Sequence, residues 1–140
     1  TLNASEDLLR DLLDGEAEAV AAAIDAAHER NTSILKYNDE NALACVINLA
    51  LYTARNKYRI VREMPTGRGF ADMVFIPWHN VSLPAIVVEL KWKQSAQTAL
   101  DQIRERHYPE SMKDYTGEVI LCGVNYDKET KVHTCVIERV

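Results

Sequence analysis

The sequence predicts an α/β fold in which a mixed β-sheet is flanked by helices. Short apolar runs rich in β-branched and aromatic residues, bounded by turn residues, have the composition of strands. Apolar residues at helical spacing precede these runs at 38–56 and separate the third run from the fourth at 94–106. The expected order is therefore α-β-β-β-α-β-β, preceded by two more helices. The strands are expected at 57–64, 70–76, 85–91, 118–124 and 132–137.

The two preceding helices carry no chemical motif. Ser5 is a candidate N-cap for the first, and Gly15 is expected to end it. Residues 16–30 form a second, alanine-rich helix whose small side chains favour close packing. We interpret residues 1–37 as an N-terminal helical extension or linker, and residues 38–140 as the main domain. The chain opens on Thr rather than Met, so we expect it to be a piece of a longer protein.

Charged residues interrupt two neighbouring apolar strands. Asp72 lies within F-A-D-M-V-F-I, and Glu89 and Lys91 lie within A-I-V-V-E-L-K-W. Side chains alternate along a strand, so Glu89 and Lys91 share a face, about 7 Å apart. Burying two carboxylates costs several kcal/mol unless a cation or hydrogen bonds compensate. A divalent cation, Mg²⁺ or Mn²⁺, suits such a set of oxygen ligands, and phosphodiester hydrolysis is the chemistry it would serve.

Simpler readings of these charges stay open. Asp72 alone is typical of an edge-strand charge that discourages aggregation. Glu89 and Lys91 alone are an ion pair worth about 0–1 kcal/mol if exposed. Glu40 falls in the first turn of the helix that Asn38 would cap, where a carboxylate stabilises the helix by about 0.3–1 kcal/mol. Glu40 is equally a candidate for a third acidic group at the site.

Composition bounds the class of protein. The chain has 140 residues, 47% of them hydrophobic, which suits one globular domain. No apolar run approaches the roughly 20 residues of a membrane helix, so no membrane partner is expected. The three cysteines lack C-x-x-C spacing, which favours reduced thiols and a cytoplasmic protein. The net charge of −5 is concentrated in residues 1–40, which hold ten acidic and three basic residues; the remainder is weakly positive and permits phosphate binding.

An ordered set of motifs covers nearly the whole chain. N-D-E-N at 38–41, P-T-G-R-G-F-A-D, V-V-E-L-K-W, Q-I-R-E-R-H-Y-P and G-V-N-Y-D-K follow one another. This set resembles the PD-(D/E)-x-K nuclease superfamily. More narrowly, it is similar to the nuclease-like C-terminal domain that follows an AAA-ATPase-like domain in many bacterial proteins. The resemblance implies a restriction-endonuclease-like core, an upstream ATPase-like domain in the same chain, and nucleic acid, with DNA expected, as substrate. Ala71 stands where the superfamily's name has proline.

The resemblance also implies roles for particular residues. Lys91 would orient or activate water and stabilise charge that develops on the phosphate. Gln102 would border the site, with a solvated helix position as its alternative. The ligands implied for Mg²⁺ or Mn²⁺ are Asp72, Glu89, Glu40 and the backbone carbonyl of Leu90.

Other residues are weaker candidates. Trp78 and Trp92 could stack on bases, although packing is the more usual role of tryptophan. The basic stretch 55–68 could follow a phosphate backbone or simply be solvated. The four histidines, at 28, 79, 107 and 133, have no metal or triad spacing. Two further classes of function stay open: a non-catalytic module that binds nucleic acid or couples to an ATPase through the acidic helices, and a structural relic of a nuclease.

Overall fold

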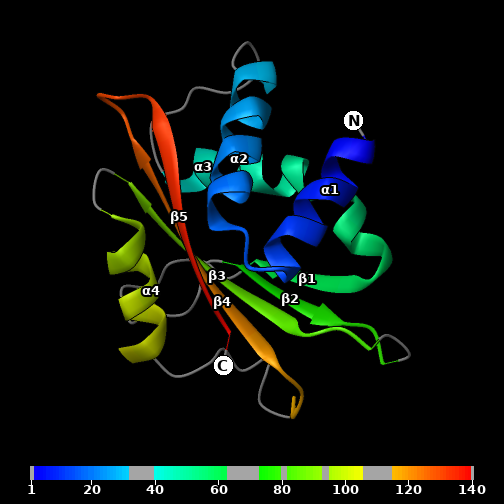
Figure 1. The fold of residues 1–140 in the computed structure, drawn as a ribbon. Coiled ribbons are helices and arrows are strands. Elements are labelled where there is room, and N and C mark those ends of the chain that lie inside the picture. The colour runs from blue at the N-terminus through cyan, green and yellow to red at the C-terminus, as the bar shows by residue number, and fades with distance from the viewer. Residues whose placement is uncertain are drawn as a thin grey trace.

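A computed structural model describes residues 2–31, 40–62, 73–79, 82–92, 95–105 and 115–139 of the chain; the side chains of 2–3, 31, 40–43 and 102–105 lie outside that description. Figure 1 shows the arrangement of the elements. They are the helices α1 (Leu2–Leu13), α2 (Ala17–Asn31), α3 (Glu40–Ala50) and α4 (Ala96–Glu105), the 3₁₀ helix η1 (Tyr52–Asn56), and the strands β1 (Tyr58–Arg62), β2 (Met73–Pro77), β3 (Ala85–Trp92), β4 (Val119–Asp127) and β5 (Val132–Arg139).

The strands form one sheet in the order β1-β2-β3-β4-β5. Neighbouring strands are antiparallel except for β3 and β4, which are parallel and are joined through α4. The carboxyl ends of β3 and β4 therefore lie at the same edge of the sheet, where β2 begins. This mixed sheet with flanking helices confirms the predicted α/β class and is consistent with a restriction-endonuclease-like fold.

Helices cover the two faces of the sheet unequally. In Figure 1, α1, α2 and α3 lie on one side of the sheet and α4 lies on the other. We call these sides the three-helix face and the α4 face. Alternation along β3 sends Ile86, Val88 and Leu90 into the core beneath α1–α3, while Ala85 and Val87 pack with α4. The strand is apolar on both sides over most of its length because both sides are covered.

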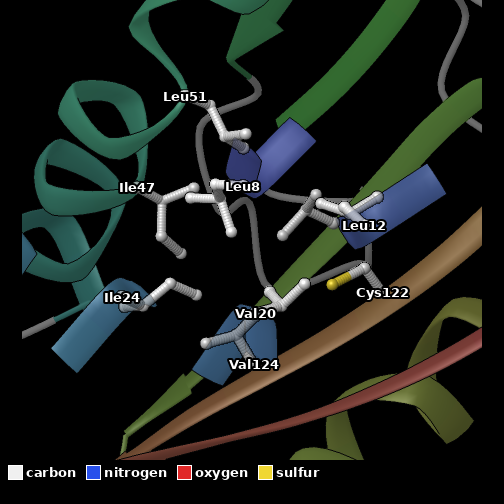
Figure 2. A pocket seen from close by; sticks show the side chains of 9 residues that line it. Leu8, Leu12, Val20, Ile24, Ile47, Leu51, Cys122 and Val124 are labelled. Carbon is white, nitrogen blue, oxygen red and sulfur yellow. The ribbon is translucent and has the colours of Figure 1, made fainter. Parts of the chain in front are cut away.

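The core beneath the three helices is closed by aliphatic side chains. Figure 2 shows this region from close by, with α1, α2 and α3 contributing leucine, valine and isoleucine above the strands. The small pocket that remains has no charged or amide group in its wall, so it offers no polar anchor for a ligand. Its lining residues are Leu8, Leu12, Val20, Ile24, Ile47, Leu51, Val88, Cys122 and Val124.

The end of α1 follows the prediction. Gly15 adopts φ +78°, a conformation that glycine enters without strain. Its N–H donates to the carbonyl of Leu12, and the N–H of Glu16 donates to the carbonyl of Asp11. These two bonds are those of a Schellman motif, which satisfies the carbonyl groups at a helix end. Gly15 therefore ends α1 and turns the chain directly into α2.

Two local predictions were wrong, and one contact explains both. Ser5 is not an N-cap: it lies within α1 and is buried. Its hydroxyl oxygen accepts the backbone N–H of Thr53 at 2.8 Å and lies 2.8 Å from the Thr53 hydroxyl. The expected helix over 38–56 instead ends at Ala50 and continues as η1. The N–H of Thr53 bonds to a side chain rather than extending the α-helical ladder, so the chain tightens into a 3₁₀ turn.

The cysteines are free thiols. Cys122 on β4 and Cys135 on β5 lie with their Sγ atoms 3.5 Å apart on the three-helix face. The hydrogen bond with Cys135 and burial both raise the pKa of the Cys122 thiol. A buried thiol held in its protonated form is a poor nucleophile and a poor metal ligand. Within the described residues, no helix is long and apolar enough to cross a membrane.

Candidate active site

Strand β3 places a carboxylate and an amine together near its carboxyl end. Glu89 and Lys91 have the same parity as Ala85 and Val87, so they project from the α4 face. Leu90 points the other way into the core. The predicted separation of an apolar face from a face that carries charge is therefore confirmed.

Both charged groups are withdrawn from water. The Glu89 side chain is 3% exposed and that of Lys91 12%, and Lys91 Nζ lies 4.0 Å from Glu89 Oε1. The reading of an exposed surface ion pair is therefore wrong. The Oε2 atom of Glu89 is buried as well. A buried carboxylate held beside an amine is a costly arrangement in a fold that otherwise fills β3 with apolar side chains.

Strand β4 supplies the neighbouring wall. Gly123 pairs with Glu89, and Asn125 pairs with Lys91, in the parallel register. Asn125 is 3% exposed and lies on the α4 face by its parity with Leu121. Asn125 lies within the motif G-V-N-Y-D-K, and no role for it was predicted from the sequence. An asparagine inside the apolar run V-I-L-C-G-V-N-Y was the signal that could have found it.

Helix α4 begins beside the same pair. A Cβ built at Gly123 would lie 2.4 Å from the carbonyl oxygen of Ala96, so only glycine lets the first turn of α4 approach β4 this closely. The Ser95 hydroxyl accepts the backbone N–H of Thr98 at 2.9 Å and caps the helix. The amino end of a helix carries partial positive charge and attracts anions. The site edge thus combines an amine, a helix amino end and one buried carboxylate.

The other predicted site residues are placed only in part. Asp72 lies outside the described residues and immediately precedes β2 in the chain. Glu40 is the first residue of α3 and Gln102 lies in α4, but neither side chain is described. Among the described side chains, no group of three or more His, Cys, Asp and Glu is arranged to hold a metal ion. The metal-ligand roles of Asp72, Glu89, Glu40 and Leu90 accordingly stay predictions.

The histidines and tryptophans divide into packed and exposed groups. His133 is buried on β5, where its backbone N–H donates to Asp25 of α2 and its Nδ1 lies 2.5 Å from the same carboxylate oxygen. Trp92 packs against Tyr126, with ring centroids 5.0 Å apart. Trp78, by contrast, is exposed. Packing thus explains Trp92 but not Trp78, and His133 joins α2 to the sheet.

The sheet and the charged residues of β3 define a class of protein. A mixed sheet of this order, with a carboxylate and a lysine at alternate positions near the end of a central strand, describes an α/β domain with a restriction-endonuclease-like core. The sequence model of the PD-(D/E)XK nuclease superfamily matches residues 38–135, and the chain belongs to that superfamily. Its members are generally nucleases that typically use divalent metals. No curated protein gave a significant match.

Proposed function

We propose that the chain is a metal-dependent nuclease that hydrolyses phosphodiester bonds, with DNA as its substrate. One observation carries the proposal: the buried Glu89 carboxylate with the Lys91 amine 4.0 Å away, in a chain of a nuclease superfamily. Stability alone gives little reason to keep this pair, because well-packed apolar residues are often as stabilising as a buried ion pair. A role in chemistry accounts for its retention.

The donor set suits Mg²⁺ or Mn²⁺. These cations prefer carboxylate and carbonyl oxygens, and Glu89 supplies a buried carboxylate. The proposal adds Asp72, Glu40 and the backbone carbonyl of Leu90 as further ligands. Asp72 immediately precedes β2, the strand that pairs with β3 up to the residue before Glu89. When bound, such a cation would polarise the phosphate and lower the pKa of a water molecule.

Groups of the chain would bind and orient the substrate around that site. The Lys91 amine would hold the attacking water or stabilise negative charge on the phosphate, and burial of its stem limits the directions in which it can point. The amino end of α4 would attract the phosphate through the helix dipole. Gln102, further along α4, would border the site. Fixed positive groups beside a phosphate stabilise developing charge with little reorganisation.

The test is a cleavage assay on plasmid and single-stranded DNA. The purified chain is expected to cut with Mg²⁺ or Mn²⁺ and to stop when EDTA is added. Glu89→Gln and Lys91→Met keep the side-chain size but remove the charge, and each is expected to lower the rate by about 100-fold or more. Calorimetric titration should show Mn²⁺ binding that Glu89→Gln weakens.

Matched controls come from the turn between β4 and β5. Lys128→Met and Glu129→Gln make the same chemical changes at exposed positions and should leave the rate unchanged. Cleavage that survives both Glu89→Gln and Lys91→Met would refute the proposal. Intact Mn²⁺ binding without cleavage of any DNA would instead favour the non-catalytic module.

A further inference from the structure

A basic and aromatic surface lies where η1, β1 and β2 meet. We call it the Tyr52 patch and define it by Tyr52, Arg55, Lys57, Arg59 and Trp78, all of them exposed. Tyr52 is 47% exposed and Trp78 43%, and both are among the most exposed large hydrophobic residues of the described chain. Aromatic rings left this open in a folded domain indicate a contact with something outside it.

The 3₁₀ geometry of η1 builds the first half of the patch. With three residues per turn, Tyr52 and Arg55 stack on one side of the helix. The Arg55 guanidinium carbon lies 4.1 Å from the centroid of the Tyr52 ring, a cation–π contact. Thr53, between them, is buried against Ser5 of α1. The Ser5–Thr53 contact that shortens α3 therefore also fixes the direction in which Tyr52 and Arg55 point.

Trp78 forms the second half. Its backbone N–H donates to the carbonyl of Lys57 at 3.1 Å, and its indole N–H donates to the carbonyl of Arg55 at 3.4 Å. Both N–H groups of the residue thus donate to the η1–β1 junction. The indole is held in place at its polar edge while much of its surface stays open. A ring fixed in this way loses little conformational entropy on stacking.

The described segments that form the patch are basic. The described residues 44–62 and 73–79 contain the four cations Arg55, Lys57, Arg59 and Arg62 and no carboxylate. The chain as a whole carries a net charge of −5, so these segments are more basic than the chain on average. Exposed aromatic rings and arginine also mark protein–protein interfaces. Four cations within these described segments favour a polyanion instead.

The patch is distinct from the candidate active site. Met73 at the start of β2 pairs with Val88, the residue before Glu89. Trp78 follows the other end of β2, five residues along the chain from Met73, which is about 16 Å at the rise of an extended strand. A polymer that spans this distance could contact both places, whereas a mononucleotide could not.

We propose that the Tyr52 patch binds single-stranded nucleic acid. Unpaired bases stack on the Trp78 indole and on the Tyr52–Arg55 pair, while Lys57 and Arg59 contact phosphates. Base pairs in a duplex hide their faces, so these rings select single strands. The proposal rests on the proposed function only in naming the form of substrate that the nuclease holds, because binding at the patch requires neither cleavage nor metal.

Fluorescence anisotropy of a labelled oligothymidylate of about 16 nucleotides, in EDTA, tests the proposal. Tyr52→Ala and Trp78→Ala are each expected to raise the Kd about tenfold, the effect of losing one stacked base. Arg55→Ala should also raise the Kd and lower the slope of log Kd against log salt by about 0.7. In a Trp92→Phe variant, Trp78 is the sole tryptophan, and its fluorescence should fall on binding.

Two control variants test whether the effects on the Kd are specific to the patch, and cleavage is measured separately. Val132→Ala removes an exposed apolar side chain on β5, 44% exposed, and should leave the Kd unchanged. Glu129→Gln, at an exposed position of the turn between β4 and β5, should also leave the Kd unchanged. A Kd within about twofold of the parent value for both Tyr52→Ala and Trp78→Ala would overturn the patch, as would equal affinity for a duplex of the same length. Absence of cleavage by the parent chain, with the patch effects intact, would overturn only the nuclease.

Discussion

The two faces of strand β3 carry different kinds of side chain. On the three-helix face, Ile86, Val88 and Leu90 are buried in the apolar core beneath α1–α3. On the α4 face, the run of apolar residues stops after Val87, and Glu89 and Lys91 take the next two inward positions. The strand's period of two lets one side stabilise the fold while the other holds charges that the fold does not need.

The difference also shows where the two faces depend on glycine. The three-helix face is filled by large side chains, and its helices stand off from the strands by the width of those side chains. On the α4 face, Gly123 has no side chain and α4 approaches the backbone of β4 directly. Close approach brings the amino end of α4 beside Glu89. On the α4 face, a glycine therefore sets the position of a helix end.

The largest expected effect on stability lies on the three-helix face. Leu90→Ala removes a fully buried side chain and should lower the free energy of unfolding by about 2–5 kcal/mol. The double variant Glu89→Gln/Lys91→Met, on the other face, should leave that free energy unchanged or raise it, because it removes both buried charges and leaves neither without its counter-charge. Urea unfolding of both variants measures the comparison. A loss in the double variant as large as at Leu90→Ala would show that the ion pair is structural.

Gly123→Ala tests the close approach of α4. The added Cβ would meet the Ala96 carbonyl oxygen at 2.4 Å and the Leu100 backbone nitrogen at 2.8 Å, and backbone atoms cannot rotate away. Overpacking of this kind costs about 1–3 kcal/mol. Because the displaced helix begins beside Glu89, cleavage should fall as well. Unfolding in urea and the cleavage assay check the two effects.

Gly15→Ala is the control for that substitution. Its φ of +78° makes alanine unfavourable by about 1–2 kcal/mol, but an added Cβ meets no atom within 4 Å. Gly15→Ala should therefore lower stability while leaving cleavage unchanged at temperatures where the chain is folded. Equal losses of cleavage in both variants would mean that the activity follows stability alone, and not the position of α4.

Much of the fold was predictable because alternation and helical spacing are local properties. The order of elements, the five strands and the shared face of Glu89 and Lys91 follow from such patterns. The role of Ser5 was not predictable, because its partner Thr53 lies 48 positions away. A serine before a helical run satisfies the rule for an N-cap equally well, and only tertiary contact decides between the two.

The candidate site was predictable in composition but less so in surroundings. Charges inside apolar strands pointed to Glu89 and Lys91, since such interruptions are costly. The wall formed by Gly123 and Asn125 depends on the parallel register of β3 and β4, which no local pattern encodes. Likewise, the exposure of Trp78 and the burial of Trp92 depend on what covers each end of the sheet. The roles of Asp72, Glu40 and Gln102 stay predictions.

The smallest predicted effect concerns His133, a buried polar residue on the three-helix face. His133 is fully buried there, and burial lowers its pKa below the ordinary value. The hydrogen bond and charge of Asp25 raise this pKa, and the nearby His28 lowers it. The net shift is downward, so the unfolded chain binds a proton at about pH 6.5 that the folded chain resists. The free energy of unfolding should therefore fall as pH drops below about 6.5 and level off below the folded pKa.

Asp25→Asn sharpens this prediction because it removes the contributions that raise the pKa of His133. The folded pKa should then fall further, so the variant should lose stability over a wider acid range than the parent chain. His133→Gln should flatten the dependence, since no proton is then taken up at this position. Urea unfolding between about pH 7.5 and about pH 5 gives the three curves. If the stability of Asp25→Asn depended less on acid than that of the parent chain, the Asp25 carboxylate would not be raising the pKa of His133. The contact between the two residues would then serve packing alone.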